Sequence, residues 1–186
     1  MLSADDPLPH RPRRIVVAGV SGTGKTTLAG RIAVLLDIEH TEIDALFHGP
    51  GWTPRPEFLH DVQRLTQSEA WVTEWQYADA RPLVAERADL MVWLDLPFRV
   101  TLARVVRRTV RRRLRREELW NGNRERPLWT FFTDREHIVR WAIRTRNKYD
   151  ERIAALARDG HVVVRLRTTA EVDRWLAGAL RAASEL

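Results

Sequence analysis

Apolar residues along the chain form two kinds of pattern. Short segments rich in apolar or β-branched residues lie at 15–18, 38–44, 71–73, 90–94 and 161–166. Segments of this length and composition predict β-strands. The run at 90–94 contains no polar residue, which predicts a central parallel strand that is buried on both faces.

The stretches between these segments repeat apolar residues at helical spacing. In the first of them, Leu28, Ile32, Leu35 and Leu36 share one face. The other predicted helices lie at 56–67, 81–87, from 98 into an arginine-rich run, at 128–157 in one or two pieces, and at 171–183. Strands that alternate with helices predict an α/β fold, with three layers and a five-stranded parallel sheet.

Three segments show neither pattern. Residues 45–55 hold glycines and prolines and predict an irregular loop, and residues 117–127 interrupt the helical pattern and predict a small flap. Residues 1–12 contain three prolines and no apolar core of a signal peptide, so we expect a disordered leader. The rest, 13–186, is expected to form one domain with a small helical lid at about 115–127.

A glycine-rich motif joins the first predicted strand to the first predicted helix. Residues 19–26 read GVSGTGKT, which is a complete phosphate-binding loop (P-loop) in its expected context. The backbone N–H groups and the helix N-terminus would hold phosphate oxygens, Lys25 would reach the β- and γ-phosphates, and the Thr26 hydroxyl would ligate Mg²⁺. The nucleotide-binding candidates here are Gly19, Ser21, Gly22, Thr23, Gly24, Lys25, Thr26 and Thr27.

Composition narrows the class of protein. A chain of 186 residues and 21.7 kDa fits a single domain, and no apolar stretch has the roughly 20 residues that span a bilayer, so a cytoplasmic protein is expected. The absence of cysteine excludes disulfides, thiolate metal sites and a cysteine nucleophile. A net charge of +6 fits either a nucleic acid or a small anionic substrate.

Four motifs together carry a family resemblance. They are GVSGTGKT at 19–26, the segment 44–52, LDLP at 94–97 and WNGNRE at 120–125. On these residues the chain resembles the adenylate-kinase-like branch of the P-loop kinases, and within it the small topology modulation proteins. The resemblance covers about 13–180 and implies the nucleoside-monophosphate-kinase fold with ATP and Mg²⁺ as cofactors.

On the ATP side, the resemblance assigns roles to several arginines. It implies that Arg104 stacks on the adenine and that Arg108, one turn on, contacts ATP phosphate. Arg124 resembles the lid arginine that closes over the transferring phosphoryl group. Arg140 and Arg144 are either a second clamp on the substrate or members of surface ion pairs. The arginines at 111–116 are either solvated surface or a nucleic-acid contact.

On the acceptor side, the residues leave more alternatives open. Asp44 is a candidate to orient or deprotonate an acceptor hydroxyl or to hold Mg²⁺ through water, and the alternative is an N-cap or a loop hydrogen bond. Glu74 is a catalytic candidate and a second candidate for Mg²⁺ through water, but family members carry Asp-Gly where this chain has Glu74 and Trp75. Trp52 would line the acceptor site, and Arg81 either binds an acceptor phosphate or belongs to a helix start that Pro82 marks.

The sequence therefore favours an ATP- and Mg²⁺-dependent phosphotransferase that acts on a small acceptor. The catalytic candidates are Lys25, Asp44, Glu74 and Arg124. The alternative is a nucleotide-binding regulatory protein that contacts DNA or RNA through the arginines at 107–116. A monomer or homodimer without membrane association is expected in either case.

Overall fold

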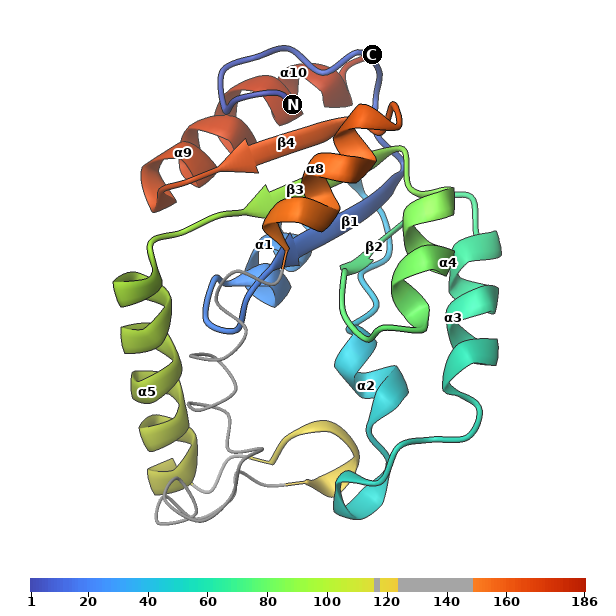
Figure 1. Cartoon of the computed structure of the whole chain (residues 1–186), viewed down its shortest axis with the longest axis vertical. Coiled ribbons are helices and arrows are strands. Elements are labelled where there is room, and N and C mark those ends of the chain that lie inside the picture. Colours follow the sequence, from blue (N-terminus) through green and yellow to red (C-terminus); the bar gives the residue numbers. More distant parts are fainter. Residues whose placement is uncertain (116–117, 124–148) are drawn as a thin grey trace.

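The computed structural model describes residues 1–115, 118–123 and 149–186 (Figure 1). Four parallel strands form the sheet in the order β2-β1-β3-β4. The strands are β1 (Arg14–Gly19), β2 (Trp71–Glu74), β3 (Leu90–Leu94) and β4 (Val163–Leu166). Gly19 pairs with Leu94, which pairs with Leu166, so the carboxyl ends of three strands meet at one edge.

Helices connect the strands and follow the predicted positions closely. The longer ones are α1 (Lys25–Leu36), α3 (Phe58–Gln67), α4 (Ala80–Arg87), α5 (Phe98–Arg115), α8 (Asp150–Arg158) and α9 (Thr169–Trp175). The short ones are α2 (Ile43–Phe47), η1 (Pro50–Trp52), η2 (Trp120–Gly122), η3 (Leu176–Leu180) and α10 (Arg181–Ser184). The expected α/β fold with a parallel sheet is confirmed.

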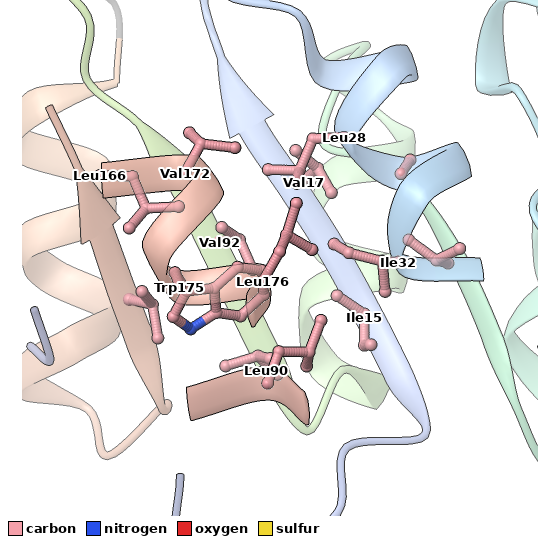
Figure 2. Close-up of a cluster of buried hydrophobic side chains, with 14 of the residues drawn as sticks. Ile15, Val17, Leu28, Ile32, Leu90, Val92, Leu166, Val172, Trp175 and Leu176 are labelled. Atoms are coloured by element: carbon pink, nitrogen blue, oxygen red, sulfur yellow. The ribbon is translucent and has the colours of Figure 1, made fainter. Parts of the chain in front are cut away.

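One face of the sheet is covered by α1 and by the run from α9 to α10. Ile15 and Val17 of β1 point to this face, where they meet Ile32 of α1 and Trp175 of α9, all almost fully buried. Figure 2 shows these side chains gathered over the strands. Burial of each large apolar side chain stabilises the fold by about 1.5–3 kcal/mol, so this layer fixes α1 against β1.

The opposite face is covered by α3, α4 and α8. Val16 and Ala18, the alternate residues of β1, point here and meet Val62, Val84 and other core residues of those helices. Trp93 of β3 is buried on this face, as predicted for the apolar run at 90–94. Because both faces are apolar and covered, the molecule has the three layers that were expected.

The predicted strand at 38–44 is wrong, and the sheet has four strands instead of five. His40 makes only an isolated parallel bridge to Val72. Three residues later the backbone N–H of Ile43 donates to the side-chain carboxylate of Glu74, at 3.0 Å, and the chain turns into α2. The Glu74 carboxylate thus accepts the Ile43 N–H, which in a longer strand would have bonded to the backbone of the neighbouring strand.

The disordered leader is also corrected by the structure. Leu2 forms a parallel bridge to Val164, and its backbone groups bond to Val163 and Arg165. Ala4 and Leu8 are buried in the core beside the sheet. The N-terminal segment therefore covers the outer edge of β4, which would otherwise be an exposed strand edge open to further pairing.

The predicted flap and the predicted helical stretch after it lie only partly within the described residues. Only 118–123 of the flap at 117–127 and the final part of the helical stretch at 128–157 are described, the latter as α8. Within the described part of the chain, no helix is long and apolar enough to cross a membrane.

Candidate active site

The P-loop lies where β1 ends and α1 begins. Gly22 and Gly24 adopt φ angles of +84° and +95°, which side-chain-bearing residues rarely adopt. A Cβ atom at Gly22 would also collide with the backbone of Thr101 in α5, so this glycine allows the loop to lie against that helix. The Thr23 hydroxyl donates to the carbonyl oxygen of Val20 at 2.8 Å and closes the turn.

Lys25 begins α1 and is almost fully buried, with 8% of its surface exposed. Its ammonium group lies 3.4 Å from the carbonyl oxygen of Val20, inside the turn of the loop. The same loop presents the N-terminal end of α1, whose partial positive charge favours an anion. This arrangement fits phosphate binding, as the motif predicted.

Arg104 lies between the P-loop and the turn after β4. Its guanidinium donates to the carbonyl oxygen of Thr23 at 3.4 Å and to the hydroxyl of Thr169 at 2.8 Å. Arg108 follows one turn later on α5 and is half-buried. The contacts of Arg104 therefore place it beside the P-loop and the start of α9.

Glu74, at the end of β2, is buried next to the P-loop. It accepts a hydrogen bond from the Ile43 N–H and lies 3.3 Å from His40 Nε2. Burial alone would raise the pKa of Glu74, but the bonds from His40, Ile43 and the Thr26 hydroxyl together lower it. Glu74 is thus held as a carboxylate in contact with Thr26.

The pair formed by Thr26 and Glu74 fits a magnesium ion that is bound mainly by nucleotide phosphates and water. Mg²⁺ prefers oxygen ligands and takes few of them from the protein. Among the described residues, no group of three or more acidic, histidine or cysteine side chains is arranged to hold a metal by itself. Thr26 and Glu74 would hold the ion together with ATP.

Asp44 lies in the first turn of α2, next to Ile43 and therefore close to Glu74. Its Oδ1 atom accepts hydrogen bonds from Gln76 Nε2 at 2.8 Å and from the Tyr77 hydroxyl at 2.6 Å. The Tyr77 oxygen also lies 3.1 Å from His48 Nε2. Asp44 does not cap α2, since the N-cap position is Glu42.

An aromatic cluster surrounds this carboxylate. Phe47 stacks on Tyr77 with ring centroids 3.9 Å apart, and Phe58 contacts both rings edge-on. The rings of His48, Trp52 and Trp120 contact one another, with the His48 centroid 5.0 Å from that of Trp52 and 6.1 Å from that of Trp120. Trp52 therefore joins this aromatic cluster through His48.

The described part of the flap, residues 118–123, is bound to the segment that follows α2. Asn123 is buried, and its side chain accepts from the Trp52 N–H and donates to the carbonyl oxygen of Gly49, both at 2.9 Å. Asn121 donates to the carbonyl oxygen of His48. In Figure 1 this segment (yellow) lies beside α2 and η1.

Arg81, at the start of α4, is also buried, with 8% exposed. Its guanidinium lies 5.5 Å from the ring centre of Trp75, which belongs to the core and does not line an open cleft. Burial lowers the pKa of Arg81, and the like charge of Arg152 lowers it further. Among the described residues its Nη1 has no hydrogen-bond partner, so an anion would be stabilised there.

The structure thus brings together most of the predicted site. The P-loop, Arg104, Glu74 and Asp44 form one continuous group, and Trp52 and Arg81 flank it through the aromatic residues. The remaining candidates, Arg124, Arg140 and Arg144, lie outside the described residues.

The sequence analysis missed the residues that surround Asp44 and Glu74. Gln76 and Tyr77 directly follow β2, and His40 precedes α2. Polar residues just beyond the carboxyl end of a strand are a general signal for a ligand site in α/β proteins. Gln76 and Tyr77 satisfy this rule, because they lie two and three residues after the end of β2.

No protein-family model matches the sequence, and no curated protein matches it. Solved structures do match. A gluconokinase from Sinorhizobium meliloti is 22% identical over 95% of this chain and 96% of its own, with a TM-score of 0.54. A shikimate kinase from Acinetobacter baumannii, in complex with shikimate, is 19% identical over 93% of this chain and 89% of its own, with a TM-score of 0.52. A shikimate kinase from Bacteroides thetaiotaomicron is 15% identical over 94% of this chain and 99% of its own, with a TM-score of 0.54.

The chain has the fold of the P-loop kinases. At these identities the likeness shows the fold alone, so the activity has to be argued from the site. The narrower resemblance to topology modulation proteins is not confirmed by these comparisons.

Proposed function

We propose that the chain is an ATP- and Mg²⁺-dependent phosphotransferase that moves the γ-phosphoryl group to a small acceptor. One observation carries the proposal: the Glu74 carboxylate, at the end of β2 beside the P-loop strand, accepts a hydrogen bond at 3.0 Å from the N–H of Ile43, the residue before Asp44. A phosphate bound in the loop would therefore lie close to both carboxylates. A protein that only binds nucleotide would not need two carboxylates, Glu74 and Asp44, next to the γ-phosphate.

The nucleotide side is assigned to the P-loop, to Glu74 beside it and to three arginines. Lys25 and the loop N–H groups would bind the β- and γ-phosphates and stabilise the charge that develops during transfer. Thr26 and Glu74 would hold Mg²⁺, which neutralises phosphate charge when bound. Arg104 and Arg108 would contact the base and phosphate, and Arg124 would close over the reacting group.

Asp44 is proposed to accept the proton of the acceptor hydroxyl. In this step the acceptor oxygen forms a bond to the γ-phosphorus, and the bond from that phosphorus to the β–γ bridging oxygen breaks. ADP leaves with the bond electrons, and the hydroxyl proton passes to Asp44 and then to water. An acceptor that offers a phosphate oxygen instead would need only orientation by Asp44.

The acceptor side favours a small hydroxylated anion. The buried guanidinium of Arg81 offers a donor to a carboxylate or phosphate, and Trp52 offers a ring surface. Arg140 and Arg144 are further candidates for the same anion. Shikimate and gluconate, the compounds named for the similar structures, both combine hydroxyl groups with a carboxylate.

The test is phosphoryl transfer from γ-labelled ATP with Mg²⁺ to a panel of shikimate, gluconate, other hydroxy acids, nucleosides and nucleoside monophosphates. We expect label in an acceptor, lost by at least about 100-fold in Lys25→Ala and partly retained in Lys25→Arg. ATP binding without transfer to any acceptor would contradict the proposal. The arginines at 107–116 would then be tested for salt-dependent DNA and RNA binding.

A further inference from the structure

The two carboxylate oxygens of Asp44 have different surroundings. Oδ1 accepts two hydrogen bonds, from Gln76 Nε2 at 2.8 Å and from the Tyr77 hydroxyl at 2.6 Å. Across residues 1–115, 118–123 and 149–186, no donor reaches Oδ2. One oxygen is therefore occupied by the protein itself, and the other is left for a different partner.

The direction of the bonds around Tyr77 follows from counting protons. Its hydroxyl has one proton, and an ionised Asp44 can only accept, so that proton goes to Oδ1. The Tyr77 oxygen must then accept from His48 Nε2, which fixes the tautomer of His48. The bonds from His48, Tyr77 and Gln76 thus all point toward Asp44.

The ionisation states agree with this direction. Burial, the charge and hydrogen bond of Asp44, and the charge of Glu74 all raise the pKa of Tyr77, so the phenol stays protonated. Burial lowers the pKa of His48, against the opposing effect of Asp44, so its imidazole is neutral at pH 7. A neutral imidazole with its proton on Nε2 donates to Tyr77 as the geometry requires.

Packing holds this arrangement in one conformation. Phe47 stacks on the Tyr77 ring at 3.9 Å and 20°, and Phe58 meets it edge-on at 5.3 Å. The backbone of Tyr77 has a φ of +55°, in the left-handed region that residues with a side chain rarely adopt. The ring contacts and the bond to Asp44 keep Tyr77 in that conformation.

We infer that Gln76, Tyr77 and His48 are positioning residues that hold Asp44 by Oδ1, so that Oδ2 is the atom that receives the acceptor's proton. This inference rests on the proposed phosphotransferase activity. The three residues do not touch the reacting atoms. Their role is to fix the plane and the orientation of the Asp44 carboxylate at the moment of transfer.

The first experiment is a double-mutant cycle with Tyr77→Phe and Asp44→Ala, measured with the acceptor that gives the strongest Lys25-dependent label. Tyr77→Phe keeps the ring and removes one hydrogen bond, so we expect kcat to fall about 10-fold with the KM for ATP unchanged. In the Asp44→Ala background, Tyr77→Phe should have no further effect.

A matched control separates positioning from packing. Phe58→Leu disturbs the same aromatic contacts but leaves the hydrogen bond between Tyr77 and Asp44 in place. Its effect on kcat should be equal in the presence and absence of Asp44. If Tyr77→Phe also behaves additively, or leaves kcat unchanged, the inference is wrong while the kinase proposal stands.

A second measurement does not depend on activity. The chain has 2 tyrosines, so Tyr149→Phe leaves Tyr77 as the only one, and its ionisation can be followed by absorbance at alkaline pH. We expect ionisation at a lower pH after Asp44→Ala is added, because the negative charge and the acceptor are both removed. An unchanged titration would overturn the inference even for a protein with no kinase activity. Absence of transfer together with a shifted titration would refute the phosphotransferase role and, with it, the function of the hydrogen-bond chain.

Discussion

The indole N–H of Trp120 donates a 2.7 Å hydrogen bond to the carboxylate of Glu42, across 78 residues of sequence. Glu42 immediately precedes α2, which carries Asp44, and Trp120 belongs to the segment 118–123. Together with the contacts of Asn121 and Asn123, this bond joins the beginning of the lid region to the wall of the proposed acceptor site. A structural change in residues 118–123 is therefore expected to affect α2 and the residues that follow it, and the reverse.

Asn123→Ala is expected to destabilise the protein. Asn123 is buried, and its amide satisfies the Trp52 N–H and the carbonyl oxygens of Gly49 and Trp120. Leaving these groups without partners costs about 1–3 kcal/mol, which corresponds to a Tm lower by about 3–8 °C. Calorimetry measures this, with Asn121→Gly as the control.

The control removes a neighbouring amide that is exposed, at a position whose φ of +55° glycine adopts freely. It should lower Tm by less than half as much as Asn123→Ala. Equal losses would mean that the segment 118–123 is not anchored by the buried amide.

Arg104→Ala is expected to weaken ATP binding with little effect on the acceptor. Arg104 connects the P-loop to Thr169, and a guanidinium beside a base contributes a factor of about 3–30 in affinity. The KM for ATP should rise by that factor while the KM for the acceptor changes less than twofold. Arg107→Ala, an exposed arginine on the same helix, is the control. A change confined to the acceptor KM would reverse the placement of the nucleotide.

Stability should depend on the ionisation of Glu74 at acidic pH. Its pKa is lower in the folded protein than the ordinary value of 4.5, despite the opposing effect of burial, because of bonds from His40, Ile43 and Thr26. A carboxyl with a depressed pKa contributes stability that is present above its unfolded pKa and is lost as pH falls through the folded value. The free energy of unfolding should therefore decrease below about pH 4.5.

Urea unfolding between about pH 3 and pH 7 checks this for the wild type and for Glu74→Gln. The variant should be less stable near neutral pH and should lose less stability on acidification. His40→Gln keeps a donor to Glu74 but removes the imidazole, so its slope should lie between the two. Parallel curves for all three proteins would show that Glu74 contributes nothing to acid unfolding.

The sequence predicted the layers, the parallel sheet and the position of the P-loop because these depend on local patterns. Alternating residues of β1, such as Ile15 and Val16, are apolar on both faces, and the P-loop follows at a fixed spacing. The strand at 38–44 failed because its outcome depended on Glu74, which is distant in sequence and takes the N–H of Ile43. The hydrophobic pattern of residues 38–44 does not reveal that a distant side chain accepts the Ile43 N–H.

The acceptor side was predicted less completely for a similar reason. Asp44 and Trp52 were recognised from their places in the sequence, but their partners Tyr77 and Asn123 come from other elements. Trp75 follows Glu74 directly, but its ring belongs to the core and its N–H donates to the carbonyl oxygen of Arg81. Side-chain contacts between distant segments cannot be read from hydrophobic periodicity.

Gly22→Ala and Gly178→Ala should have opposite effects on stability. At Gly22, alanine would adopt a φ of +84°, and its Cβ would collide with the backbone of Thr101. The left-handed conformation alone costs about 1–2 kcal/mol, and relief of the collision would move α5 away from the P-loop. We therefore expect lower Tm and a large loss of ATP affinity.

Gly178 lies in the helical segment η3, where a Cβ atom would meet nothing within 4 Å, so alanine should stabilise by about 0.5–1 kcal/mol. Thermal unfolding with and without Mg²⁺-ATP measures both quantities, and a Gly22→Ala protein that binds ATP normally would show that the contact between the loop and α5 is not needed for the nucleotide site.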